Sequence, residues 1–132
     1  MAWRESFNVP PMIHRNPIPT ASRVGNMLYT SVIAGRDPET GQVPDSAAEQ
    51  AANAFKLLGM ILEKAGATPG DVAHVTVFVR DNSTREHVNT AWLQMFPDEH
   101  SRPARHTIVM ENLGGHVQIE AVAVIQGGSQ PA

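Results

Sequence analysis

Apolar positions in two stretches of this 132-residue chain recur at steps of three and four, the spacing that gives an α-helix one apolar face. The stretches span residues 46–65 and 83–96. Each opens on a serine followed three residues later by a glutamate, the spacing of a capping box. The two pairs are Ser46 with Glu49 and Ser83 with Glu86. A glycine or a proline follows each stretch and stops it, so the pattern predicts two helices.

Runs rich in β-branched residues predict the strands. They are residues 27–33, 72–80, 101–110 and 116–125, with a short edge strand at 6–9. The resulting order, β-(β)-α-β-α-β-β, contains strand–helix–strand units. The crossover connections of such units are right-handed, which places both helices on the same face of a sheet. The expected fold class is therefore α+β, a single mixed β-sheet with two helices packed on one face.

Neither a repeat nor a linker divides the chain, so residues 1–132 are expected to form a single domain. Residues 1–15 are expected to form an N-terminal arm, and residues 127–132 a loose tail. The sheet face without helices would still carry many valines and alanines. A broad apolar face on a small domain predicts burial against other subunits, and hence a closed oligomer.

Polar side chains are placed at alternating positions on the last two strands. These strands flank residues 113–115, a Leu-Gly-Gly sequence that predicts a hairpin with a glycine turn. Alternation puts Arg105 and Thr107 on one face of the first strand, and Gln118 and Glu120 on one face of the second. Folding back at the glycines would bring all four to one sheet surface. An exposed face with an incidental ion pair is the alternative interpretation.

Composition excludes several classes of function. The formal net charge is −3 and the 10 basic residues are scattered, so no nucleic-acid partner is expected. Cysteine is absent, which excludes disulfides and thiol catalysis. The six histidines lack the spacing of metal ligands. Apolar runs stay well short of the roughly 18–20 residues of a membrane span. The N-terminus lacks a signal-peptide core, so a cytoplasmic location without membrane contact is expected.

The order of elements and a series of short motifs resemble the reactive intermediate deaminase (Rid, YjgF-type) family over residues 16–125. The motifs are Gly25-Asn26-Met27, Thr30-Ser31, residues 37–41 (Asp-Pro-Glu-Thr-Gly), Ala65-Gly66-Ala67, residues 75–79 (Val-Thr-Val-Phe-Val), Val88-Asn89, residues 102–105 (Arg-Pro-Ala-Arg) and residues 119–123 (Ile-Glu-Ala-Val-Ala). The resemblance implies a chorismate-mutase-like subunit in a homotrimer, with pockets at the subunit interfaces. It also implies hydrolysis of enamines and imines to 2-oxo acids and ammonia, without metal or cofactor.

The same resemblance assigns roles to residues of this chain. The family's carboxylate-binding arginine falls on Arg105, and the small residue after it on Thr107. The serine that ends the second strand falls on Ser31, and the asparagine of the second helix on Asn89. A planar guanidinium suits the anchoring role because it grips a carboxylate through two parallel hydrogen bonds.

Other site positions depart from the family. Ile18 stands where the family has a pocket tyrosine, and Val32-Ile33 replaces a Gly-Gln pair. The glutamate that positions water falls on Gln118, or on Glu120 if the alignment gap lies later in the hairpin. These replacements make the expected pocket more apolar.

Three functions follow from these expectations. The first is a hydrolase, an enamine or imine deaminase that acts on 2-imino acids, with Arg105 as the anchor of the substrate carboxylate. The alternative is a non-catalytic module that binds small carboxylates such as 2-oxo acids. RNA cleavage or translation inhibition ranks third, because a basic groove and stacking aromatic residues are not visible in the sequence.

Overall fold

The computed structural model describes residues 2–126, so the tail expected at 127–132 lies outside the described residues. The strands are β1 (Arg4–Phe7), β2 (Ala21–Val24), β3 (Met27–Thr30), β4 (Ile33–Ala34), β5 (Val72–Val79), β6 (Ala104–Val109) and β7 (Val117–Val124). The helices are α1 (Ala47–Lys64) and α2 (Arg85–Met95), with short 3₁₀ turns η1 (Pro69–Asp71) and η2 (Asn82–Thr84). The strands form one sheet.

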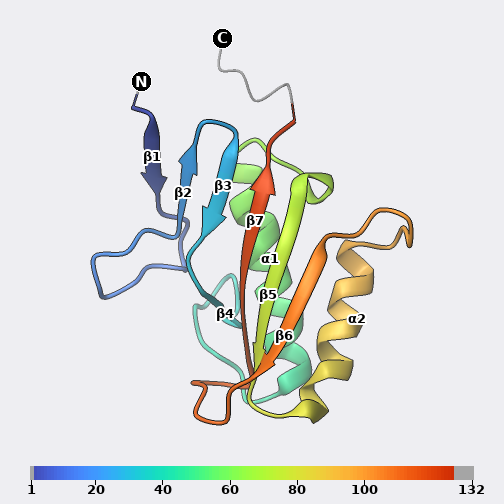
Figure 1. The fold of residues 1–132 in the computed structure, drawn as a ribbon. Helices are drawn as coiled ribbons and strands as arrows, with labels where there is room; N and C mark the ends of the chain where they lie inside the picture. The colour runs from blue at the N-terminus through green and yellow to red at the C-terminus, as the bar shows by residue number, and fades with distance from the viewer. Residues whose placement is uncertain (1, 127–132) are drawn as a thin grey trace.

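The sheet is mixed and carries both helices on one side (Figure 1). Its order is β1-β2-β3-β7-β5-β6, and β4 also pairs with β7. Only the β5–β6 pair is parallel among these described pairings, because α2 carries the chain across between those two strands. The expected fold class, an α+β subunit with a single mixed sheet and two helices on one face, is confirmed.

The predicted hairpin of the last two strands is wrong. β6 and β7 do not pair with each other, because β5 lies between them, parallel to β6 and antiparallel to β7. The glycine-containing loop instead passes over the end of β5: Met110 N–H donates to the Val79 carbonyl, and Arg80 N–H donates to the His116 carbonyl. A central position, with a strand on each side, suits the valine-rich β5. Local turn signals in the sequence do not reveal that β5 takes this position.

The strand expected at 27–33 is also interrupted. It forms β3 and then the two-residue β4, and a strand that the sequence pattern missed, β2, precedes it. β2 and β3 are joined through Gly25, whose φ of 59° is the left-handed conformation that favours glycine in a tight turn. The short edge strand expected at 6–9 lies at Arg4–Phe7.

α1 begins and ends as predicted. The Ser46 hydroxyl oxygen accepts the Glu49 N–H at 3.2 Å, and Gly66, with φ 75°, follows the last residues of the helix. α2 begins later than expected, at Arg85. Asp81 accepts hydrogen bonds from both the backbone and the hydroxyl of Ser83, so a 3₁₀ turn forms before the helix and Ser83 does not cap it.

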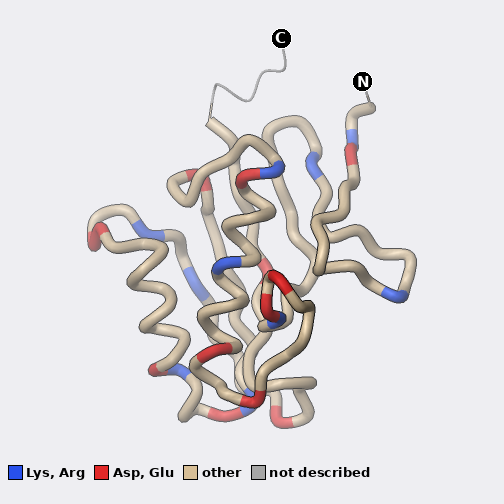
Figure 2. Tube along the Cα trace, turned by 180° about the vertical axis from the view of Figure 1, so that it is seen from behind, with Lys and Arg blue, Asp and Glu red and all other residues tan. Residues whose placement is uncertain are grey.

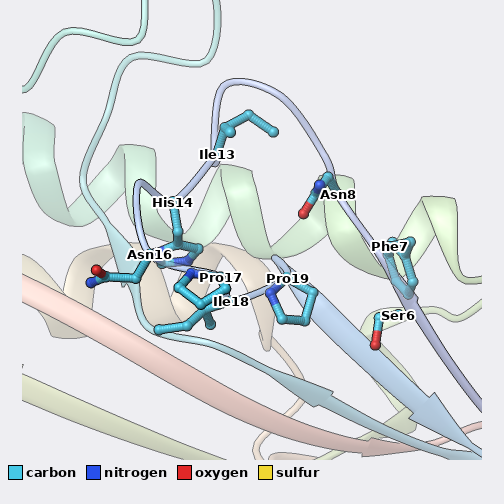
Figure 3. Close-up of a pocket in the computed structure, with 9 residues that line it drawn as sticks. All are labelled: Ser6, Phe7, Asn8, Ile13, His14, Asn16, Pro17, Ile18 and Pro19. Atoms are coloured by element: carbon cyan, nitrogen blue, oxygen red, sulfur yellow. The ribbon is translucent and has the colours of Figure 1, made fainter.

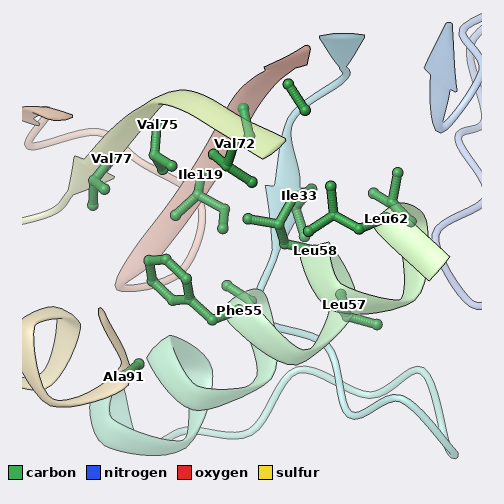
Figure 4. Close-up of a cluster of buried hydrophobic side chains, with 14 of the residues drawn as sticks. Ile33, Phe55, Leu57, Leu58, Leu62, Val72, Val75, Val77, Ala91 and Ile119 are labelled. Carbon is green, nitrogen blue, oxygen red and sulfur yellow. The ribbon is translucent and has the colours of Figure 1, made fainter. Parts of the chain in front are cut away.

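The core lies between α1 and the odd-numbered residues of β5 and β7. Val75, Val77 and Ile119 are fully buried and face Leu58 and Phe55 of α1 (Figure 4). Burying each aliphatic side chain of this size stabilises the fold by about 1.5–3 kcal/mol. The even-numbered residues of the same strands therefore lie on the sheet face that has no helices.

That second face carries both apolar and polar side chains, and part of it is open. Tyr29 of β3 is 50% exposed, Ile108 of β6 is 44% exposed and Val124 of β7 is 40% exposed. Register places Tyr29 beside Val122, and Ile108 beside Phe78, on the side away from the helices. A sheet face with exposed apolar side chains of this kind is a candidate for contact with other copies of the chain.

Candidate functional site

Arg105 of β6 is held in one position by three contacts. Its Nε–H donates to the Thr107 hydroxyl oxygen at 2.9 Å, and an Nη2–H donates to Asn89 Oδ1 at 2.9 Å. The guanidinium carbon lies 5.1 Å from the ring centroid of Trp92. Thr107 follows Arg105 by two positions on the same strand face, and α2 brings Asn89 and Trp92 alongside. Strand alternation and helix packing together fix the direction of this side chain.

The charge of Arg105 has no carboxylate partner among residues 2–126. The two ion pairs present there, Glu86 with His87 and Glu99 with His100, do not involve it. Burial, and after it the nearby charge of Arg85, lowers the pKa of the Arg105 guanidinium. A half-buried guanidinium that contacts only neutral acceptors and a ring face attracts an anion, because an arginine side chain stays charged in proteins.

A second group of predicted residues lines a pocket of about 410 Å³ on the other side of the molecule's sheet. The pocket is lined by Met12, Ile13, His14, Ile18, Ser31, Val32, Ala34, Arg36 and Gln118. The Ser31 hydroxyl donates to the Pro19 carbonyl at 2.7 Å, which ties β3 to the N-terminal segment. The Gln118 side-chain nitrogen donates to the Gly114 carbonyl at 2.9 Å. This hydrogen bond fixes the Gln118 side chain and so sets the direction of its amide oxygen.

The N-terminal segment that walls this pocket is itself fixed by hydrogen bonds. The Thr20 hydroxyl donates to the Met12 carbonyl at 2.7 Å and accepts the Val9 N–H at 3.0 Å. A smaller hollow of about 280 Å³ lies against the same segment and shares Ile13, His14 and Ile18 with the larger pocket (Figure 3). The segment therefore presents Ile18 between two cavities.

Glu120 lies on the same face of β7 as Gln118, as strand alternation predicts, but in a different hollow. Thr76 is its neighbour across the β5–β7 pairing. The hollow measures about 170 Å³ and is lined by Tyr29, Thr30, His74, Thr76, Glu120, Ala121 and Val122. His106 approaches the same region, with its ring centroid 4.8 Å from that of His74. Glu120 thus lies on the sheet face that has no helices, beside polar as well as apolar side chains.

The four polar residues predicted to share one sheet surface do not converge within one chain. Arg105 is aligned with Val75 across the β5–β6 pairing, and Val75 with Ala121 across the β5–β7 pairing. Arg105 and Thr107 therefore lie on the helix side, while Gln118 and Glu120 lie on the opposite face. The expectation failed because it assumed a direct hairpin; with β5 interposed, the face that Arg105 shares with β7 is the odd-numbered one.

Sequence reasoning missed two neighbours of Arg105. Trp92 is a core residue of α2, 8% exposed, and its ring also underlies the guanidinium. Arg85 stands four residues before Asn89 and so shares its face of α2, and an Arg85 Nη2–H donates to the Thr107 carbonyl at 3.5 Å. The four-residue spacing of Arg85 and Asn89 was the available signal, but no local sequence pattern indicates that α2 packs beside β6.

Within residues 2–126, groups of three or more histidine, cysteine, aspartate or glutamate side chains arranged to hold a metal ion do not occur. Over the same residues, neither helix combines the length and the apolar character needed to cross a membrane.

Several known proteins are similar to this chain. The family model described as Endoribonuclease L-PSP matches residues 14–126. The 2-iminobutanoate/2-iminopropanoate deaminase of Escherichia coli is 34% identical over 102 residues, 76% of this chain and 80% of that protein. The Bos taurus protein of the same name is 35% identical over 109 residues, 82% of this chain and 80% of that protein. The crystal structure of the E. coli YjgF gene product matches with a TM-score of 0.76 at 32% identity, over 84% of this chain and 90% of that one.

Proposed function

This chain belongs to the Rid (YjgF/RutC) family, and from that premise we propose that it is a cofactor-independent deaminase that hydrolyses 2-imino acids and related enamines to 2-oxo acids and ammonia. The E. coli and Bos taurus relatives named as 2-iminobutanoate/2-iminopropanoate deaminases support this class of reaction. The observation that carries the proposal is the positioned arginine: Arg105 is fixed by Asn89 and Thr107 at 2.9 Å each and has no carboxylate partner among the described residues.

Arg105 has the donors needed to hold a substrate carboxylate. The hydrogen bonds to Thr107 and Asn89 use its Nε–H and one Nη2–H. Two N–H groups are left on Nη1 and one on Nη2, and an N–H from each of these nitrogens can point outward along the end edge of the planar guanidinium. That edge matches the two oxygens of a carboxylate, so the substrate binds through paired, charge-assisted hydrogen bonds.

The site is completed between subunits of a homotrimer. One protomer supplies Arg105, Thr107 and Asn89, and its neighbour supplies the pocket of Ile18, Ser31, Val32 and Gln118. Two features support this arrangement. The two groups lie on opposite faces of the sheet in a single chain, so neither holds a substrate alone. The sheet face without helices also exposes Tyr29, Ile108 and Val124, which burial in an interface would cover.

Hydrolysis then needs a positioned water and little else. Water oxygen adds to the imine carbon while one of its protons passes to the imine nitrogen, which gives a carbinolamine. The hydroxyl proton next moves to the nitrogen as the carbon–nitrogen bond breaks, and a 2-oxo acid and ammonia leave. The Gln118 amide oxygen orients the water, since its nitrogen is engaged with the Gly114 carbonyl at 2.9 Å. Glu120 is the alternative group for this role. Holding the reactants together supplies much of the acceleration.

The pocket that receives the rest of the substrate is larger and more apolar than a very small imino acid requires. It measures about 410 Å³, and Met12, Ile13, Ile18 and Val32 contribute apolar walls. The substrate side chain therefore extends along these residues, away from Arg105. We assign Ile18 and Val32 to side-chain binding and Ser31 to the polar rim of the same pocket.

The test is ammonia release from imines generated in solution by an amino-acid oxidase, across a panel of amino acids. The chain should accelerate release over buffer for at least part of the panel. Arg105→Ala should abolish the acceleration, and Arg105→Lys should retain only a small part of it, because lysine keeps the charge and loses the paired donors. Arg15→Ala, which removes an exposed arginine outside both pockets, is the matched control. Absence of acceleration with every amino acid would overturn the proposal.

A second candidate function is binding of small carboxylates without turnover. It is favoured by Gln118, because a neutral amide orients water but does not remove a proton. Stabilisation by 2-oxo acids in a thermal melt, without ammonia release from any imine, would support it. RNA cleavage remains the third function: basic and acidic positions are interspersed along the chain (Figure 2), which does not favour a polyanionic ligand.

A further inference from the structure

The larger pocket contains a cation that the proposed reaction does not use. Arg36 lines it together with the apolar side chains of Ile18 and Val32. Its Nη1–H donates to the Gly41 carbonyl at 3.1 Å. The lining of this pocket includes no aspartate or glutamate, and neither ion pair within residues 2–126 involves Arg36. Arg36, an exposed residue, thus borders a mostly apolar cavity whose lining includes no carboxylate.

The backbone on both sides of Arg36 is fixed. Before it, Ala34 pairs with Gln118 of β7, and Gly35 passes so close to α1 that a Cβ added there would lie 2.4 Å from the Gln50 carbonyl oxygen. After it, the Asp37 N–H donates to the Gln42 carbonyl at 2.7 Å, which closes a tight turn. Arg36 therefore leaves a rigid strand end, and its position relative to the Gln118 side of the pocket is set by the fold.

From this geometry we propose that Arg36 binds a second anionic group, so that the preferred substrates are imino acids whose side chain ends in a carboxylate. The inference rests on the proposed function, in which Arg105 holds the first carboxylate. A mostly apolar cavity with few convergent polar groups takes its specificity from those groups. Here the charged group is a guanidinium, whose fork fits a carboxylate.

A carboxylate fits better than a phosphate. A phosphate monoester carries about −1.5 to −2 charges and several acceptor oxygens, and so needs more than one donor group with positive charge. The other polar members of the pocket do not supply a second guanidinium: the Ser31 hydroxyl already donates to the Pro19 carbonyl at 2.7 Å, the Gln118 nitrogen donates to the Gly114 carbonyl at 2.9 Å, and His14 adds an imidazole. A single negative charge on a short carbon chain matches one arginine and apolar walls.

The experiment compares two classes of imine with one enzyme preparation. Imines of glutamate and aspartate carry a distal carboxylate; imines of leucine and methionine do not. We expect a higher kcat/KM for the first class. Arg36→Gln should lower it about 10-fold or more for the first class and less than about twofold for the second, since a charge-assisted bond is lost only there. Arg15→Gln, an equal charge change at an exposed position outside the pocket, should alter neither class.

A binding measurement separates failure of this inference from failure of the proposed function. Thermal stabilisation by 2-oxoglutarate is compared with that by 2-oxobutanoate, which needs no turnover. If no imine is hydrolysed but 2-oxoglutarate stabilises the chain more strongly, and Arg36→Gln removes that difference, the deaminase proposal fails while the pocket assignment stands. Equal treatment of the two classes by the unmodified chain, in turnover and in binding, overturns the role of Arg36. So does a class preference that survives Arg36→Gln.

Discussion

At the scale of single residues, the proposed site depends on an arginine whose position is fixed by contacts within the chain. Side-chain ordering costs up to about 2 kcal/mol for a long flexible residue. For Arg105 the fold meets that cost through the hydrogen bonds to Thr107 and Asn89, both at 2.9 Å, and the contact with the Trp92 ring at 5.1 Å. Because these partners are neutral, they position the guanidinium without neutralising it.

A carboxylate placed at Asn89 should therefore inhibit the site from within. In Asn89→Asp, the new side chain lies beside Arg105 Nη2, where the asparagine oxygen now accepts at 2.9 Å, and forms an ion pair that competes with the ligand carboxylate. We expect 2-oxobutanoate affinity, measured by isothermal titration, to fall about 10-fold further than in Asn89→Ala. Asn89→Ala removes one hydrogen bond and should cost about 2- to 10-fold. Equal affinities in the two variants would contradict the positioning role.

At the scale of elements, Gly35 allows the end of β4 to approach α1 more closely than a residue with a Cβ would. A Cβ at Gly35 would lie 2.4 Å from the Gln50 carbonyl oxygen, whereas one at Gly59, inside α1, meets nothing within 4 Å. Gly35→Ala should thus lower the melting temperature by several degrees and shift Arg36, because overpacking costs about 1–3 kcal/mol. Gly59→Ala should raise the melting temperature, since alanine favours a helix by about 1 kcal/mol. The pair is measured in one set of thermal melts, and a harmless Gly35→Ala would show that β4 is free to move.

Which elements the sequence predicted, and which it did not, follows the range of the interactions. α1 was predictable to the residue because its signals are local: Ser46 caps it and Gly66 ends it. The fold class was also predictable, since it follows from the order of elements. The pairing of β7 was not, because the choice between β5 and β6 as its neighbour depends on contacts between distant parts of the chain.

The candidate site inherits that limit. The resemblance pointed to Arg105, Asn89 and Thr107, and the structure brings these three together. The strand pattern alone placed Gln118 and Glu120 beside Arg105, which the interposed β5 rules out within one chain. Alternation is enough to assign the residues that share one face of a strand. To tell which residues of another strand lie on the same side of the sheet, the strand pairing must also be known.

At the scale of the whole molecule, the proposed site is divided between the two faces of the sheet. Arg105 and its partners lie on the helix side, while the pocket with Ile18, Ser31 and Gln118 lies around β4 and β7. In the proposed homotrimer, a closed ring of three copies would bring one half of each copy against the other half of the next. In a closed ring every copy uses both halves, whereas in an open pair each copy leaves one half unpaired.

Mixing two inactive variants tests this arrangement directly. Arg105→Ala leaves the pocket intact, and Val32→Trp blocks the pocket but leaves the arginine. Each homotrimer should be inactive, but every mixed trimer contains one interface in which an intact arginine meets an intact pocket. With equal amounts and random assembly after refolding together, about a quarter of the wild-type activity should return, because three trimers in four are mixed and each has one site in three restored. Simple addition of the folded variants, without exchange of subunits, is the control and should remain inactive. If the co-refolded mixture stays inactive while each variant still assembles as a trimer by light scattering, the two halves do not meet across a subunit boundary.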